Sequence, residues 1–166
     1  MCALYGLEEQ MTGRLQLLEE LKRISENCCR LVSLAGAEHL DYRPQDNMRS
    51  LRELGNHLAQ IPAIDLTILK GAKENEVQAA ERELDRPDPA GWCEVLREGQ
   101  QELHRYMERL SLDEYENNSG TAFYGRTQTH AQWLLEIITH MYHHRAQFFM
   151  YLKLNGYDVS TRTLYQ

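Results

Sequence analysis

Two histidines near the C-terminus, His140 and His144, are well placed to bind a metal ion. Residues four apart on a helix lie on the same face, so both imidazoles can reach one ion at bond lengths of about 2.0–2.1 Å. The spacing equals that of H-E-x-x-H, but position 141 is a methionine. Because the catalytic glutamate of that motif is missing, we exclude a zincin-type protease.

A third ligand must come from elsewhere in the chain, and His57 is the best candidate. Its neighbours recur at helical spacing and predict a buried helix face: Leu54, Leu58 and Ile61. An imidazole on that face must be hydrogen-bonded or metal-bound, because burying it unpaired is costly. His143 points about 100° away from His144 around the helix. Spacing alone leaves two alternatives open: a metal site formed by His57, His140 and His144, or a hydrogen-bonded core histidine beside a solvated pair.

Glu136 lies one turn before His140 on the same predicted helix face and is a candidate catalytic residue. It could accept a hydrogen bond from an imidazole, serve as a fourth ligand or act as a base. The alternative is a solvated glutamate early in a helix, where its charge favours the dipole. Tyr124, Arg126 and Tyr142 are candidates for the mouth of a pocket. A di-iron carboxylate centre is not expected, because no glutamate has a histidine three positions later.

Four long segments with helical periodicity would position these side chains. The first lies within residues 4–35, where apolar residues recur at spacings of three and four. The second begins at Ser50, which forms an S-x-x-E capping box with Glu53. Its apolar pattern continues past Pro62, which predicts a kink, and Gly71 ends it.

The third and fourth helices also carry recognisable ends. The pair Asp88–Pro89 predicts the start of the third, with aspartate as cap and proline in the first turn. Thr127 or Thr129 caps the fourth, which runs to about Asn155 and stops at Gly156.

Three connections separate these helices. Residues 39–49 contain Pro44 and cannot be helical throughout, residues 73–86 predict a short polar surface helix, and residues 111–126 predict a long connection. The connections after the first and third helices are candidates for crossovers. With no convincing strand pattern, the sequence predicts an all-α four-helix bundle with one short extra helix, as a single domain spanning residues 1–166.

Composition narrows the function classes. The chain has 166 residues, of which 42% are hydrophobic and 26% charged, and its net charge is -7. An acidic chain repels phosphate backbones, so we expect no nucleic-acid partner. No membrane span or secretory signal is expected. The cysteines form no C-x-x-C pair and predict reduced thiols in the cytoplasm, with Cys28 packed in the core: Cys2, Cys28, Cys29 and Cys93.

Two stretches resemble the DinB/YfiT-like superfamily of bacterial metal-binding helical bundles: MRSLRELGNHLAQI around His57, and THMYHHRAQFFMYLKLNG near the C-terminus. The second is similar to the family pattern H-x-x-x-H-R-G-Q, followed by apolar residues and glycine. The matching positions are His140, His144, Arg145, Gln147, Leu152 and Gly156. Ala146 stands where glycine is usual, which a helix interior tolerates. We expect Arg145 to anchor the last helix through an ion pair.

The resemblance implies an up-down-down-up bundle, a three-histidine site for one divalent metal (zinc, nickel or iron) and a homodimer. Some relatives look like thiol S-transferases or isomerases that use a low-molecular-weight thiol. The expected function is therefore a metal-dependent thiol S-transferase acting on small electrophiles. Two alternatives stay open: a metal-dependent hydrolase, and a non-catalytic metal-binding, dimerising bundle in a stress response.

Overall fold

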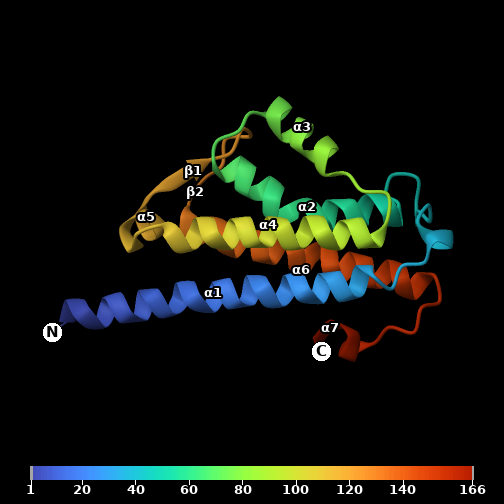
Figure 1. Ribbon diagram of the computed structural model, residues 1–166, viewed down its shortest axis with the longest axis horizontal. Coiled ribbons are helices and arrows are strands. Elements are labelled where there is room, and N and C mark those ends of the chain that lie inside the picture. The colour runs from blue at the N-terminus through green and yellow to red at the C-terminus, as the bar shows by residue number, and fades with distance from the viewer. Residues whose placement is uncertain (1, 166) are drawn as a thin grey trace.

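Four long helices form the body of the protein (Figure 1). The computed structural model describes the backbone of residues 2–165 and the side chains of residues 13–165. The long helices are α1 (Cys2–Val32), α2 (Leu51–Leu69), α4 (Pro89–Arg109) and α6 (His130–Leu154). The expected all-α four-helix bundle is confirmed.

The helix directions follow the up-down-down-up order. In Figure 1, α1 runs from left to right, α2 and α4 both run back from right to left, and α6 again runs from left to right. Helices α1 and α2 each pack against both α4 and α6, so α1 and α2 lie on one diagonal of the bundle. This arrangement places α2 beside α6, the two helices that carry the candidate ligands.

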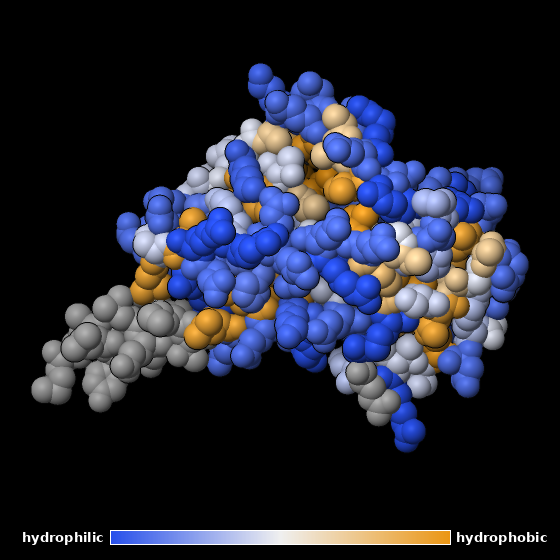
Figure 2. All heavy atoms as spheres, in the orientation of Figure 1, coloured by the Kyte–Doolittle hydropathy of each residue, from blue (hydrophilic) through white to orange (hydrophobic). Residues whose placement is uncertain are grey.

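The parallel pair α2 and α4 requires a return along the bundle, and α3 (Glu74–Leu84) provides it. We expected crossovers after the first and third helices, whereas this return lies after the second. Helix α3 packs on α2 through the buried Val77. Figure 2 shows a mainly hydrophilic face, with hydrophobic atoms visible beneath α3.

The predicted helix ends agree with the structure. The Ser50 side chain accepts from the backbone N–H of Glu53, whose carboxylate accepts from the Ser50 N–H, which completes the capping box. Asp88 caps α4, and Thr129 rather than Thr127 caps α6. Gly156 adopts φ 79° just after α6, a conformation that costs glycine little. Helix α2 continues through Pro62, as the apolar pattern indicated.

The short extra helix expected within residues 73–86 is present as α3, but it is not the only short element. The structure also contains α5 (Leu112–Asn117), α7 (Thr161–Tyr165) and the 3-10 helix η1 (Ala37–His39). The connection 111–126 ends in a hairpin of β1 (Ser119–Thr121) and β2 (Thr127–Thr129), in the antiparallel register Ser119↔Thr129. These elements are too short to show helical or alternating periodicity, which is why the pattern missed them.

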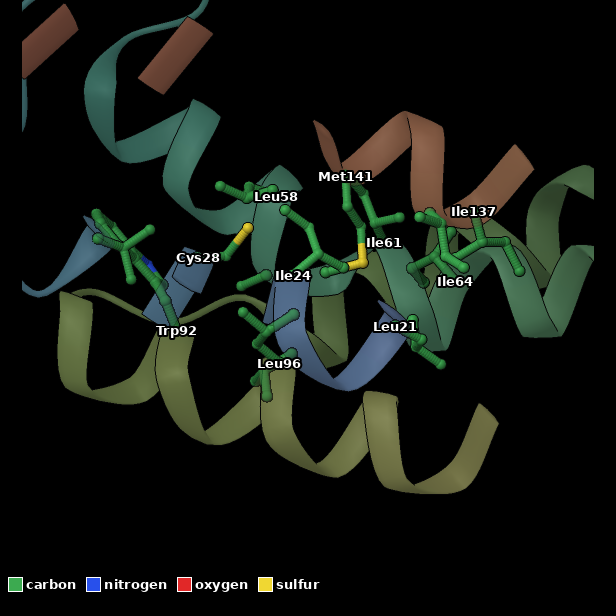
Figure 3. Close-up of a cluster of buried hydrophobic side chains, with 14 of the residues drawn as sticks. Leu21, Ile24, Cys28, Leu58, Ile61, Ile64, Trp92, Leu96, Ile137 and Met141 are labelled. Carbon is green, nitrogen blue, oxygen red and sulfur yellow. The ribbon is translucent and has the colours of Figure 1, made fainter. Parts of the chain in front are cut away.

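The core lies between the four long helices (Figure 3). Side chains of all four meet there, among them Leu21, Ile24, Leu58, Ile61, Trp92, Leu96, Ile137 and Met141. Cys28 is completely buried in this core, as expected. Gly55 gives Trp92 room, because a Cβ at position 55 would lie 2.5 Å from its ring. None of the described helices is both long and apolar enough to cross a bilayer.

Candidate metal centre

The structure brings His57 of α2 together with His140 and His144 of α6. One ring nitrogen of each residue can be chosen so that all three lie within 4.8 Å of one another. The Nε2 atoms of His57 and His144 are 3.0 Å apart, and the ring centroids of His140 and His144 are 4.8 Å apart. His57 is 83 positions before His140 in the chain, and the packing of α2 on α6 brings its ring to the other two.

Two imidazoles of this cluster, those of His57 and His144, are held in the neutral form that a metal requires. Burial is the main cause that lowers the pKa of His57 to about 3, and the Arg49 guanidinium adds to it. Burial also lowers the pKa of His144 to about 4, although a hydrogen bond with Gln147 opposes the shift. A neutral imidazole has a free lone pair, so both residues can act as ligands near neutral pH.

Hydrogen bonds to the other ring nitrogens fix which lone pairs are free. His140 Nδ1 lies 2.9 Å from Asp65 Oδ2, and His144 Nδ1 lies 2.8 Å from Gln147 Oε1. Both oxygens only accept, so each Nδ1 carries the hydrogen and each Nε2 keeps its lone pair. Carboxylates and other acceptors orient metal-binding histidines in this way. The residues present therefore fit a divalent transition metal.

The cluster opens into a cavity of about 600 Å³ between α2, α3, α6 and the hairpin. Its lining includes His57, His140, Ile64, Trp133 and Glu81. A second, shallower cavity of about 410 Å³ shares His57 and is lined by Arg49. Two routes thus lead from the surface to the cluster. One is lined mainly by acidic and apolar side chains, and the other by polar side chains that include two guanidinium groups and three carboxylates.

Glu136 lines the larger cavity, but its carboxylate already has partners. Its Oε2 accepts from Gln128 Nε2 at 2.5 Å and lies 3.0 Å from Arg126 Nη2. The carboxylate on the His140 ring comes from Asp65 instead. Tyr124 lines the cavity mouth, whereas the Tyr142 hydroxyl points to Glu20 of α1 and is not part of the site.

The other histidines stay outside the cluster. His130 is a hydrogen-bonded core residue, with Tyr106 Oη on Nε2 and the Glu114 carbonyl on Nδ1. His39 binds the Tyr157 hydroxyl. Arg145 anchors α6 as expected, but without an ion pair among the described residues. It donates to Asn27 Oδ1 and to a carbonyl of α7, and its guanidinium lies 4.5 Å from the Tyr142 ring centroid.

Sequence reasoning missed Asp65 and Arg49. Asp65 is the only charged residue between positions 58 and 69, and it is 8% exposed. A lone carboxylate in such an apolar helix signals a buried polar partner, so it could have been found. Arg49 lies just before the cap of α2, and nothing in its sequence context indicates that its side chain turns toward the histidines.

The fold and the site together define the class of the protein, a four-helix bundle with a three-histidine group that could hold a metal. A model of the DinB family matches residues 9–164. The chain belongs to the DinB family. A comparison with curated protein sequences gives no match.

Solved structures share the fold. A candidate DinB-family protein from Exiguobacterium sibiricum 255-15 is 30% identical, with TM-score 0.75 over 91% of this chain and 97% of its own. A DinB-like protein from Bacillus cereus ATCC 10987 is 15% identical, with TM-score 0.69 over 87% and 93%. YfiT from Bacillus subtilis, a four-helix bundle of unusual topology, is 15% identical, with TM-score 0.68 over 87% and 89%.

Proposed function

We propose that this protein is a divalent-metal-dependent thiol S-transferase that acts on small electrophiles in the cytoplasm. The observation that carries the proposal is the convergence of His57, His140 and His144 beside a cavity of about 600 Å³, which His57 and His140 line. Structural metal sites are closed by four protein ligands, whereas three ligands beside a cavity are typical of catalytic sites. Zinc, nickel and iron all suit imidazole ligands.

His57, His140 and His144 would hold a divalent cation, which would supply the Lewis acidity that makes a bound thiol or water lose a proton more readily. The protein's own residues prepare this site. Asp65 and Gln147 orient His140 and His144, and burial keeps His57 and His144 neutral. Ile64 and Trp133 line the cavity wall and exclude water from one side of the substrate.

The choice of a thiol over water follows from the surroundings of the site. A hydrolase benefits from a free carboxylate or imidazole that takes a proton from water. Here Glu136 is engaged by Arg126 and Gln128, and Asp65 is engaged by His140. His143 is hydrogen-bonded to Gln147, which leaves Glu81 of α3 as the lining carboxylate without an ion pair among the described residues. A thiol ionises far more easily than water and needs no such base once it is activated. This arrangement favours the thiol as nucleophile.

Arg49 supports an anionic thiol as co-substrate. Its guanidinium is close enough to lower the pKa of both His57 and His144, and it forms no ion pair among the described residues. It lines the smaller cavity, which also reaches His57. An unpaired guanidinium suits a carboxylate on the incoming molecule. We therefore assign the smaller cavity to the thiol and the larger, partly apolar one to the electrophile.

The experiment starts from metal-free protein that is reloaded with zinc, nickel or iron. Each form receives a low-molecular-weight thiol and an aryl halide, and thioether and halide release are measured. We expect turnover with one equivalent of metal and a thiol, and none with His57→Ala. Arg49→Gln should raise the KM for a carboxylate-bearing thiol at unchanged metal content. Arg82→Gln, a charge change in the same smaller cavity, is its control.

The proposal fails if the loaded protein never transfers a thiol. Ester or amide hydrolysis without thiol would instead assign a hydrolase, which is the second candidate function. The fold shared with YfiT favours this candidate, because YfiT is described as a candidate metal-dependent hydrolase. In that case Glu136, released from Arg126, is the base that we would test. Metal binding without either reaction would indicate a non-catalytic, stress-response binding protein. We also propose a homodimer, supported by the family resemblance and checked by light scattering.

A further inference from the structure

Two cysteines outside the metal centre lie against each other where α1 packs on α4. Cys29 Sγ lies 3.7 Å from the Cys93 carbonyl oxygen, and Cys93 Sγ lies 3.4 Å from the Cys29 carbonyl oxygen. Each sulfur thus lies against the backbone of the other cysteine. These residues are 64 positions apart in the chain, so their contact is a property of the fold.

A cavity of about 690 Å³ leads to this pair. Cys29 and Ser33 form part of its wall, together with the cationic side chains Lys22 and Arg97. Ser33 Oγ lies 3.5 Å from Cys93 Sγ, so the Cys93 sulfur lies directly behind this wall. Each cysteine is nevertheless at most 5% exposed, which restricts access to small reagents.

The surroundings favour ionisation of one thiol of the pair. The hydrogen bond from Cys29 is the main cause that lowers the pKa of Cys93, and burial opposes it. Ser33 and the positive charge of Arg97 lower the pKa of Cys93 further. The pKa of Cys29 is raised, because it keeps its proton in the shared hydrogen bond. A thiolate beside a thiol is the arrangement that reacts with oxidants.

We propose that Cys29 and Cys93 form an oxidation site at which a peroxide converts the two thiols to a disulfide that joins α1 to α4. The Cys93 thiolate attacks one peroxide oxygen, the O–O bond breaks, and hydroxide leaves, which yields a sulfenic acid. The Cys29 sulfur then attacks the Cys93 sulfur, and water leaves with the Cys29 proton. Both thiols are oxidised by two electrons in total, and one hydrogen peroxide is reduced to two water molecules.

The neighbouring Cys28 provides an internal control. It is fully buried, and burial raises its pKa to about 12. Figure 3 shows its side chain among the apolar side chains of the core. Adjacent residues on a helix point about 100° apart, so Cys28 cannot take the place of Cys29 without a rotation of α1. The site should therefore distinguish two consecutive cysteines.

The test uses a Cys2→Ser chain, which prevents disulfides between molecules through that residue. One equivalent of hydrogen peroxide should lower the intact mass by two hydrogens and consume two of the three remaining thiols. Digestion without reduction should give one cross-linked peptide pair containing Cys29 and Cys93. Closing a loop of this length should raise the Tm by about 5–15 °C, and a reductant should reverse the rise.

Variants assign the site. Cys29→Ser and Cys93→Ser should each lose the disulfide, whereas Cys28→Ala should keep it. Cys28 and Cys29 stay on one peptide, so fragment ions of the cross-linked pair must show which of the two carries the bond. The proposal is overturned if the bond is on Cys28, or if oxygen adducts accumulate without a disulfide. The peptide map of the chain with all three cysteines decides this even if a variant fails to fold. Zinc affinity should stay unchanged on oxidation, because α1 and α4 carry none of the three histidines. Formation of the disulfide therefore tests the oxidation site independently of the proposed transferase activity.

Discussion

The contact between Asp65 and His140 makes a quantitative prediction about metal affinity. Asp65 is 8% exposed, and its Oδ2 lies 2.9 Å from Nδ1 of an imidazole that is 31% exposed at the side chain. The carboxylate fixes the tautomer and increases the electron density on Nε2. Removing such a partner of a metal ligand typically weakens metal binding by about 10–100-fold, or roughly 1.4–2.7 kcal/mol.

Two substitutions at this position separate orientation from charge. Asp65→Asn keeps a carbonyl oxygen that can accept from His140 Nδ1, so it removes mainly the charge, and we expect about tenfold weaker binding. Asp65→Ala removes both the charge and the acceptor, and leaves the ring free to rotate. For this variant we expect about 100-fold weaker binding.

The assay is a competition between the metal-free protein and a chromophoric zinc chelator at a pH above 7. Glu81→Gln is the matched control, because it removes one negative charge from the same cavity. No described contact joins the Glu81 carboxylate to a histidine, so its effect should stay below threefold. Circular dichroism of the metal-free variants checks that each has folded. The reasoning is refuted if Asp65→Ala binds zinc as tightly as Glu81→Gln does.

Three further predictions concern stability. Gly55→Ala should destabilise the fold by about 1–3 kcal/mol, because the added Cβ would overlap the Trp92 ring. Gly13→Ala should stabilise it by about 0.5–1 kcal/mol, because the added Cβ meets open space on a helix. Urea unfolding measures both changes. The metal-free protein should lose stability as the pH falls from about 6.5 toward 4. In the folded state the pKa values of His57 and His144 are about 3 and 4, so both stay neutral over this range. The same histidines in the unfolded chain bind protons there, which favours unfolding. A His57→Gln variant should show a smaller slope in Tm against pH, and an equal slope would contradict this assignment. Removal of the metal with a chelator should lower the Tm but leave the helical circular dichroism unchanged, and loss of the helical signal would contradict a core that folds without metal.

The long helices and the shared face of His140 and His144 could be predicted because each depends on local patterns. Capping boxes and apolar periodicity gave the start of α2 at Ser50, and the four-residue spacing placed His140 and His144 on one face. The pairing of His57 with them needed the resemblance to the DinB family, because no local rule says which helices are neighbours. The structure brings the three rings together.

The contacts that the hairpin makes with the site could not be predicted in the same way. Glu136 was chosen because it lies on the face of His140, but its carboxylate pairs with Arg126 and Gln128 across the hairpin. That pairing depends on strands three residues long, whose position is set by tertiary contacts. Trp133, for example, donates to the Gly120 carbonyl at 3.1 Å and so ties the hairpin to α6. Such contacts leave no periodic signal in the sequence.

The histidine cluster lies on long helices, whereas part of the cavity wall comes from the connections between them. The three histidines and Asp65 lie on α2 and α6, which are held by a core that also includes α1 and α4. The remaining walls of the larger cavity include Glu81 of α3 and Tyr124 of the hairpin, both from connections between the long helices. A rigid scaffold therefore fixes the reactive position, while segments that tolerate insertion and substitution surround the substrate. Under the proposed function, relatives could keep the same three histidines and still bind different electrophiles. The residues that select the substrate would then lie in α3 and the hairpin rather than in the histidine motif.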